Sequence, residues 1–223
     1  EINNKQIELD KLKAQIKTHR DFAPANYDDF AADAHGTAVA GVIGAASNNG
    51  IGVVGIAPSA QLSVLRACWY RRSDSRRAVC DSFTLAKALS YALESETNII
   101  NLSFGGPSDR LLGRLVELAL QRGMIVVAAA PTTQPYGFPA DISGVIVVES
   151  EHSADSASTL QRFPVQAPGD EILVPVPGGG FGYASGTSLS AAHVSGIVAL
   201  LFSMQPDLSG DEINALLLDS RTV

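Results

Sequence analysis

The sequence contains few charged residues, few aromatic residues and only two cysteines. Charged side chains make up 17% and aromatic side chains 6% of the 223 residues, whereas 46% are hydrophobic. A disordered chain carries more charge and fewer apolar residues, so this composition favours one compact domain spanning residues 1–223. An excess of 23 acidic over 16 basic residues gives a net charge of −7, which argues against a general nucleic-acid partner.

The sequence also lacks a long apolar run. No such run approaches the roughly 20 residues that a membrane-spanning helix needs, and the first residues do not resemble a signal peptide. We therefore expect no membrane partner, and we expect that any export signal has been removed.

The two cysteines, Cys68 and Cys80, bracket the polar segment WYRRSDSRRAV. A pair closing a short irregular loop is typical of a disulfide in an oxidising compartment, which predicts a secreted or periplasmic protein. The alternative is two buried thiols in a cytosolic protein. A metal site is disfavoured because no third or fourth Cys or His lies nearby. We interpret five arginines here as parts of a solvated loop, namely Arg66, Arg71, Arg72, Arg76 and Arg77.

Short apolar runs alternate with stretches of helical periodicity, which predicts a doubly wound α/β fold with a mainly parallel sheet and helices on both faces. The expected strands are Gln61 to Ala67, Asn98 to Phe104, Met124 to Ala130 and Val145 to Glu149. The expected helices are 83–96 and 108–122, which connect strands into two βαβ units, followed by 187–204 and 209–220. Asp81 and Ser82 are capping candidates for the first helix, and Gly123 suits the C′ position of the second.

Two segments carry side chains suited to nucleophilic catalysis. Gly186-Thr187-Ser188 opens the helix 187–204, where unpaired backbone N–H groups and the helix dipole would stabilise an oxyanion. The alternative is that Thr187 or Ser188 only caps this helix. His35-Gly36-Thr37 supplies an imidazole at the start of another helix, with small neighbours that allow close packing against a nucleophile.

The chain resembles the subtilase family of serine proteases in four successive segments. These are HGTAVAGVIGAASNNGIGVVGIAPSAQLSVLRA, NIINLSFGGPS, IVVAAA and ASGTSLSAAHVSGIVALL. The segments are distributed so that the match spans nearly the whole chain. The resemblance implies a serine endopeptidase acting on polypeptides, with Ser188 forming an acyl-enzyme and His35 as general base. It implies no cofactor for the chemistry, and a propeptide or an inhibitor as further partners.

The sequence departs from the family pattern at the catalytic aspartate. The family carries it in a segment resembling I-D-T-G, which is missing here. The alignment of the first residues predicts the Asp two positions before Glu1, so we expect the domain to be truncated at its N-terminal end. The aspartates that precede the histidine lie in a polar stretch and are interpreted as surface residues, namely Asp28, Asp29 and Asp33.

A second departure affects the oxyanion donor. Where the family usually reads VVAAAGN, this chain has Pro131 and Thr132 after its alanines, so the Thr132 hydroxyl stands in the donor position beside the Ser188 backbone N–H. The hydroxyl is shorter than an Asn amide, and proline removes the freedom of the family's glycine. The alternative function is therefore a degenerate subtilase that binds polypeptides without cleaving them.

The resemblance also assigns substrate-binding residues. Ser103, Phe104 and Gly105 match the strand that pairs with an extended substrate backbone. The lining of the primary specificity pocket is implied to be Ala128, Ala129 and Ala130, with Gly137 at the floor, and such small linings favour large apolar side chains.

A structural calcium ion is the one metal that the resemblance suggests. Residues 47–53 resemble the calcium loop of the family, with Asn49 as side-chain ligand, and Glu8 falls on the carboxylate ligand. The alternative is a glycine-rich turn without metal.

Overall fold

The computed structural model describes residues 16–24, 32–70, 78–131, 137–151 and 164–219. At its centre is a four-stranded parallel sheet in the order β5 (Ile99–Leu102), β6 (Ile125–Ala129), β7 (Ile146–Ser150) and β8 (Val165–Ala167). The first three strands confirm the prediction, whereas β8 was not predicted because it is only three residues long.

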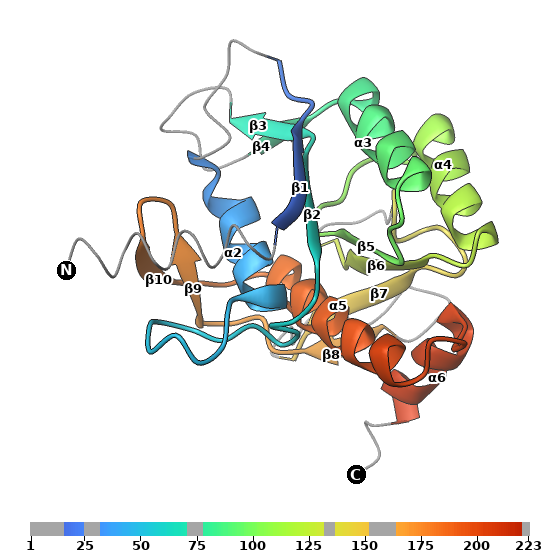
Figure 1. The fold of residues 1–223 in the computed structure, drawn as a ribbon. Coiled ribbons are helices and arrows are strands. Elements are labelled where there is room, and N and C mark those ends of the chain that lie inside the picture. The colour runs from blue at the N-terminus through green and yellow to red at the C-terminus, as the bar shows by residue number, and fades with distance from the viewer. Residues whose placement is uncertain (1–15, 25–31, 71–77, 132–136, 152–163, 220–223) are drawn as a thin grey trace.

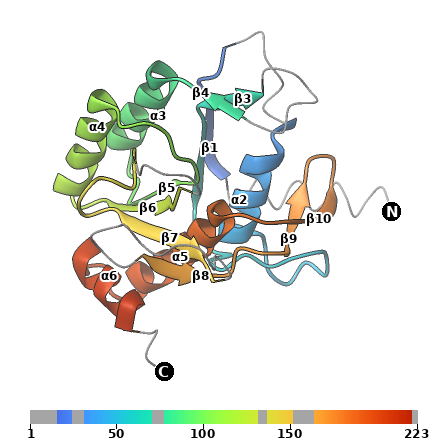
Figure 2. The same ribbon diagram turned by 180° about the vertical axis from the view of Figure 1, so that it is seen from behind.

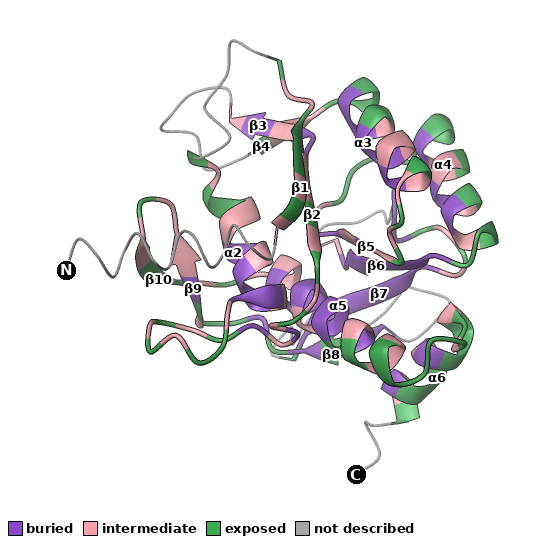
Figure 3. Ribbon diagram, viewed as in Figure 1, coloured by how far each residue is buried: buried purple, intermediate pink, exposed green. Residues whose placement is uncertain are grey.

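Helices cover both faces of this sheet, as predicted (Figures 1 and 2). Along β6 the side chains alternate: Val126 and Ala128 pack in one cluster with α3 (Ser82–Glu94) and α4 (Arg110–Gln121). Ile125 and Val127 pack on the other side with α5 (Thr187–Met204) and α6 (Gly210–Asp219). Figure 3 shows the buried sheet between the partly exposed helices. Successive side chains of β6 therefore point to opposite faces of the sheet and pack in two separate hydrophobic cores.

The predicted capping residues occupy the expected positions. The Asp81 carboxylate accepts the Thr84 N–H at 2.7 Å and begins α3. Asp109 caps α4 in the same way, and Gly123 follows that helix with φ of 79°, a conformation that favours glycine.

The strand β2 (Leu62–Arg66) lies in a second sheet, where it pairs in parallel with β1 (Ile16–Asp21). Of the two predicted βαβ units, β5–α4–β6 joins neighbouring strands of one sheet. In the other unit, β2 and β5 belong to different sheets among the described residues, so the prediction of a single connected unit was wrong there. The sequence pattern missed β1 because this strand is mostly exposed and polar.

Two antiparallel hairpins complete the described fold. In the first, β3 (Cys68–Tyr70) pairs with β4 (Ala78–Cys80), and a disulfide joins Cys68 to Cys80 directly across the two strands. The predicted disulfide is confirmed, and the alternative of two buried thiols is excluded. The second hairpin, β9 (Ile172–Val176) and β10 (Gly180–Ala184), leads directly into α5.

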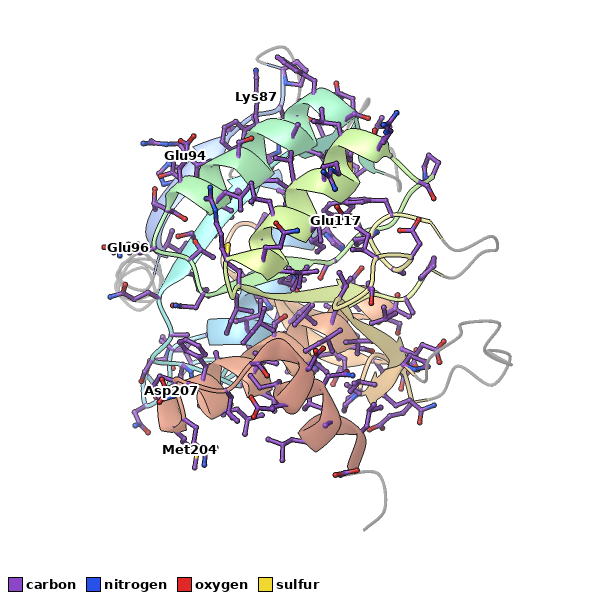
Figure 4. The ribbon with its side chains drawn as sticks, turned by 90° about the vertical axis from the view of Figure 1, so that its right-hand side faces the viewer. Lys87, Glu94, Glu96, Glu117, Met204 and Asp207 are labelled. Carbon is purple, nitrogen blue, oxygen red and sulfur yellow. A yellow bond between two sulfur atoms is a disulfide. The ribbon has the colours of Figure 1, made fainter. Side chains whose placement is uncertain are left out.

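Solvent-facing and core-facing helices differ in their side chains. Lys87 and Glu94 point outward from α3 (Figure 4). By length and composition alone, α5 is the one helix of the described part that could cross a membrane. Its residues Ala191, Val194 and Val198 are at most 1% exposed and pack against the sheet, as expected of the central helix of a folded domain.

Candidate active site

Ser188 lies in the first turn of α5, as the sequence predicted. The N-cap is Gly186, whose φ is 148° and whose N–H donates to the Gly169 carbonyl at 2.7 Å. No side chain of the described residues caps this helix. The interpretation of Thr187 or Ser188 as a simple helix cap is therefore excluded.

The Ser188 side chain is bonded to the end of strand β5. Its hydroxyl donates to the Ser103 carbonyl oxygen at 2.9 Å, and the Ser103 hydroxyl donates to the Ser188 carbonyl oxygen at 2.9 Å. A serine hydroxyl has one proton, so in this structure that proton points to Ser103 and not to His35. Acting as a nucleophile requires the hydroxyl to exchange this acceptor for a base.

Further hydrogen bonds fix the first turn of α5 against the sheet. The Thr187 hydroxyl donates to the Ala130 carbonyl at 2.9 Å, just beyond the end of β6. Behind Ser103, the side-chain amide Nδ2 of Asn101 donates to the Ser103 hydroxyl at 2.8 Å, and the Ser195 hydroxyl donates to Asn101 Oδ1 at 2.9 Å. Sequence analysis missed Asn101 and Ser195. The available signal was the seven-residue spacing that places Ser195 on the same helix face as Ser188.

His35 lies in the first turn of α2 (Ala34–Gly44). The N-cap is Asp33, whose carboxylate accepts the Gly36 N–H at 2.7 Å, while the Asp33 backbone carbonyl accepts the Thr37 hydroxyl at 2.6 Å. The Asp33 side chain is only 20% exposed. Its interpretation as a surface residue was wrong, because capping draws the carboxylate onto the helix end.

Arg66 is buried beside the start of α2. Its side chain is 5% exposed, and its Nη1 donates to Asp21 at 2.9 Å while its Nε lies 3.5 Å from an Asp33 carboxylate oxygen. Within the described part of the chain, the Nε and Nη2 atoms have no hydrogen-bond partner. The placement of Arg66 in a solvated loop was wrong, because two carboxylates stabilise its charge inside the fold. The other four arginines of that segment lie outside the described residues.

The environment of His35 favours its neutral form. Although the residue is exposed, packing around the imidazole removes hydration and lowers the pKa of His35 below 6.5; the negative charge of Asp33 opposes this shift. A neutral imidazole is the form that accepts a proton at neutral pH.

The helices that carry the two candidate catalytic residues pack against each other. Val39 and Val42 of α2 share a buried cluster with Leu189 and Ala192 of α5. His35 precedes Val39 by one helical turn, and Ser188 directly precedes Leu189. A common core thus fixes the two helices relative to each other.

The predicted substrate-binding residues lie at the carboxyl ends of β5 and β6. Ser103 is buried, Phe104 is half-buried and Gly105 is exposed. The three alanines of the predicted pocket lining are 0%, 4% and 3% exposed, namely Ala128, Ala129 and Ala130. Gly137 packs so closely against the Gly106 carbonyl that a Cβ would lie 2.3 Å from that oxygen.

Two predicted residues lie outside the described part of the chain, namely Thr132 and Glu8. The other predicted calcium ligand, Asn49, uses its side-chain oxygen to accept the Ile51 N–H at 3.0 Å within a local turn. Among the described residues, no three His, Cys, Asp or Glu side chains form a group that could hold a metal.

Comparison with known proteins agrees with this arrangement. A protein-family sequence model, described as the subtilase family, matches residues 3–222 of the chain. Subtilisin E of Bacillus subtilis (strain 168) is 33% identical over 213 residues, covering 90% of this chain and 54% of that protein. An intracellular serine protease of Paenibacillus polymyxa is 32% identical over 235 residues, covering 95% of this chain and 69% of that protein.

A solved structure extends the similarity to the fold. Fervidolysin from Fervidobacterium pennivorans, described as a keratinolytic enzyme related to subtilisin, superimposes with a TM-score of 0.76 at 26% identity. The match covers 92% of this chain and 36% of that one. The chain spans about half the length of subtilisin E. Because one relative is named intracellular, similarity to these proteins does not fix the compartment.

Proposed function

Because the chain belongs to the subtilase family, we propose that it is a serine endopeptidase that cleaves polypeptides through an acyl-enzyme on Ser188. One observation carries the proposal. The Ser188 hydroxyl stands at the N-terminus of α5, takes no part in capping, and is held 2.9 Å from the Ser103 carbonyl at the end of β5.

The proposed reaction uses His35 and Ser188 in turn. An extended substrate that pairs with Ser103 donates its N–H to the Ser103 carbonyl, so that the Ser188 hydroxyl gives up this acceptor and turns to His35. Ser188 Oγ attacks the peptide carbonyl carbon as His35 takes the hydroxyl proton. His35 then gives this proton to the leaving amine, and water hydrolyses the acyl-enzyme. The backbone N–H of Ser188 and the Thr132 hydroxyl donate to the oxyanion.

An acidic group that orients His35 completes the proposal. Asp33 is already engaged as helix cap and partner of Arg66. We assign the orienting role to an Asp two positions before Glu1 in the parent protein, and the coding sequence immediately upstream tests this assignment. The disulfide supports an exported protein, and a structural calcium bound by Asn49 and Glu8 remains part of the proposal.

A degenerate subtilase that binds polypeptides is the second candidate. One observation favours it: Pro131 stands where the family has glycine. Such a protein would retain polypeptides without producing fragments.

Hydrolysis of fluorescently labelled casein separates the two candidates. The oxidised protein should release fragments. The Ser188→Ala and His35→Ala variants should hydrolyse casein at least about 10³-fold more slowly. Equal rates for all three proteins would refute the peptidase, and casein binding without cleavage would establish the second candidate.

A further inference from the structure

Pro131 closes the space between the ends of β5 and β6 beside the proposed nucleophile. If a methyl group were built on Gly105, its carbon would lie 3.8 Å from Pro131 Cβ and 3.8 Å from the Phe138 carbonyl oxygen. These are ordinary van der Waals contacts, so the two segments almost touch. Pro131 thus fills a place that a glycine would leave open.

A distance bound follows from this contact. Since a Cα–Cβ bond is about 1.5 Å long, Gly105 Cα and Pro131 Cβ are at most about 5.3 Å apart. Non-bonded carbons prefer separations of about 3.5–4.0 Å, so a carbon placed between them needs about 7 Å. A substrate side-chain carbon therefore cannot lie on the line between Gly105 Cα and Pro131 Cβ.

The base of the same space is closed as well. The Gly106 N–H donates to the Phe138 carbonyl at 2.9 Å, which holds the two segments together. Gly137 lies against the Gly106 carbonyl with no room for a Cβ. The Phe138 ring does not open the space, because it is 3% exposed and belongs to the core shared with α3 and α4.

We infer that Pro131 is a specificity-determining residue that restricts the substrate residue on the acyl side of the scissile bond to glycine or alanine, in contrast to the large apolar side chain expected from the small pocket lining. The inference rests on the proposed function, which directs that residue's side chain into the space between Ser103–Gly105 and Ala128–Ala130. Glycine has no side chain to insert, and the alanine methyl stays at the mouth. A leucine or phenylalanine side chain would have to pass between Gly105 and Pro131.

The test uses peptides that differ only at this position, carrying Ala, Leu or Phe, and four forms of the protein. In the unchanged protein, kcat/KM for the Ala peptide should exceed that for the Phe peptide by at least about tenfold. Pro131→Gly removes the contacting Cβ and should erase or reverse the preference. Pro131→Ala relaxes the backbone but keeps a Cβ, so it should retain the preference. Adding Gly105→Ala to Pro131→Gly should restore it in part.

A binding measurement makes the inference independent of turnover. The same peptides are titrated by calorimetry against the Ser188→Ala protein, with and without Pro131→Gly. Preferential binding of the Ala peptide, lost in Pro131→Gly, would support the inference even if no peptide were cleaved, in which case the peptidase proposal alone would fall. A Phe preference, or none, in the unchanged protein would overturn the role of Pro131 and leave the peptidase intact. No cleavage together with no binding would overturn both.

Discussion

The carbonyl oxygen of Ser103 accepts the hydroxyl proton of Ser188, and the Ser103 hydroxyl donates in turn to the Ser188 carbonyl oxygen, each over 2.9 Å. This reciprocal pair ties the end of β5 to the first turn of α5. It holds the proposed nucleophile in place, and it also engages the Ser188 hydroxyl proton in a hydrogen bond to Ser103.

Ser103→Ala should therefore disturb the nucleophile more than the fold. The change removes the hydroxyl that bonds the Ser188 carbonyl and accepts from Asn101, with an expected loss of about 1–3 kcal/mol in the free energy of unfolding. The rate at which a fluorophosphonate labels Ser188 should fall, because the first turn of α5 loses an anchor. Urea denaturation and timed mass spectrometry measure the two effects.

Ser195→Ala is the matched control. It breaks the hydrogen bond to Asn101 at the far end of the same network without touching Ser188. Stability should fall by a similar amount, while the labelling rate should change much less. Equal loss of labelling in both variants would show that Ser103 acts through general stability.

The lowered pKa of His35 predicts how activity and stability depend on pH. Since lost hydration of the imidazole lowers the pKa of His35 below 6.5, the folded protein holds this proton less tightly than the unfolded chain does. The acid limb of the kcat/KM profile should therefore have its midpoint below pH 6.5. The contribution of His35 to the free energy of unfolding is fully present above pH 6.5. It decreases as the pH falls from 6.5 through the lowered pKa of His35 in the folded protein.

Substitution of Asp33 separates its charge from its capping role. Asp33→Asn keeps an oxygen for the Gly36 N–H but removes the charge that raises the pKa of His35, so this pKa should fall further. Asp33→Ala should lower the pKa of His35 by a similar amount. It should also lower the free energy of unfolding by about a further 1 kcal/mol, because the helix cap is lost. NMR titration of the His35 ring and urea denaturation measure these effects. An unchanged or higher His35 pKa in Asp33→Asn would contradict the assignment.

The disulfide should contribute substantially to stability. Cys68 and Cys80 are 12 positions apart, and closing a loop of this length is worth about 3 kcal/mol. The oxidised protein should resist urea better than the double variant Cys68→Ala/Cys80→Ala by about this amount. Dithiothreitol should abolish the difference, by destabilising the wild-type protein and leaving the variant unaffected. Coincident urea midpoints before reduction would show that the cross-link adds no stability.

Thr132 tests the proposed oxyanion donor. Thr132→Val should lower kcat with little change in KM, because the hydroxyl contributes chiefly in the transition state. Thr132→Asn restores the donor that the family uses and should preserve or raise the rate. Steady-state kinetics on a chromogenic peptide measure kcat and KM for the unchanged protein and both variants. The same kcat for the Thr and Val proteins would remove Thr132 from the mechanism.

The parts of the fold that sequence reasoning predicted are those with strong apolar periodicity. The strands β5, β6 and β7 are short apolar runs, and α5 was predicted with its observed bounds. The strands β1 and β9 escaped prediction. β1 is largely exposed, and Pro175 lies inside β9, where proline normally argues against a strand.

Ser188 and His35 are candidates from local motifs and from the resemblance to the subtilase family, and their positions at two helix starts are confirmed. The pairing of Arg66 with Asp21 and Asp33 joins residues distant in the sequence, so no local pattern could reveal it. The same applies to the contact between Pro131 and Gly105, which depends on how closely the ends of two neighbouring strands approach.

Fluorophosphonate labelling followed by peptide mapping tests the central claim most directly, because it asks whether Ser188 is an activated nucleophile. We predict a single covalent adduct on Ser188, formed at a rate that falls by at least about 10² in His35→Ala. No adduct on Ser188, or an adduct formed equally fast without the His35 imidazole, would contradict the assignment of this pair as nucleophile and base.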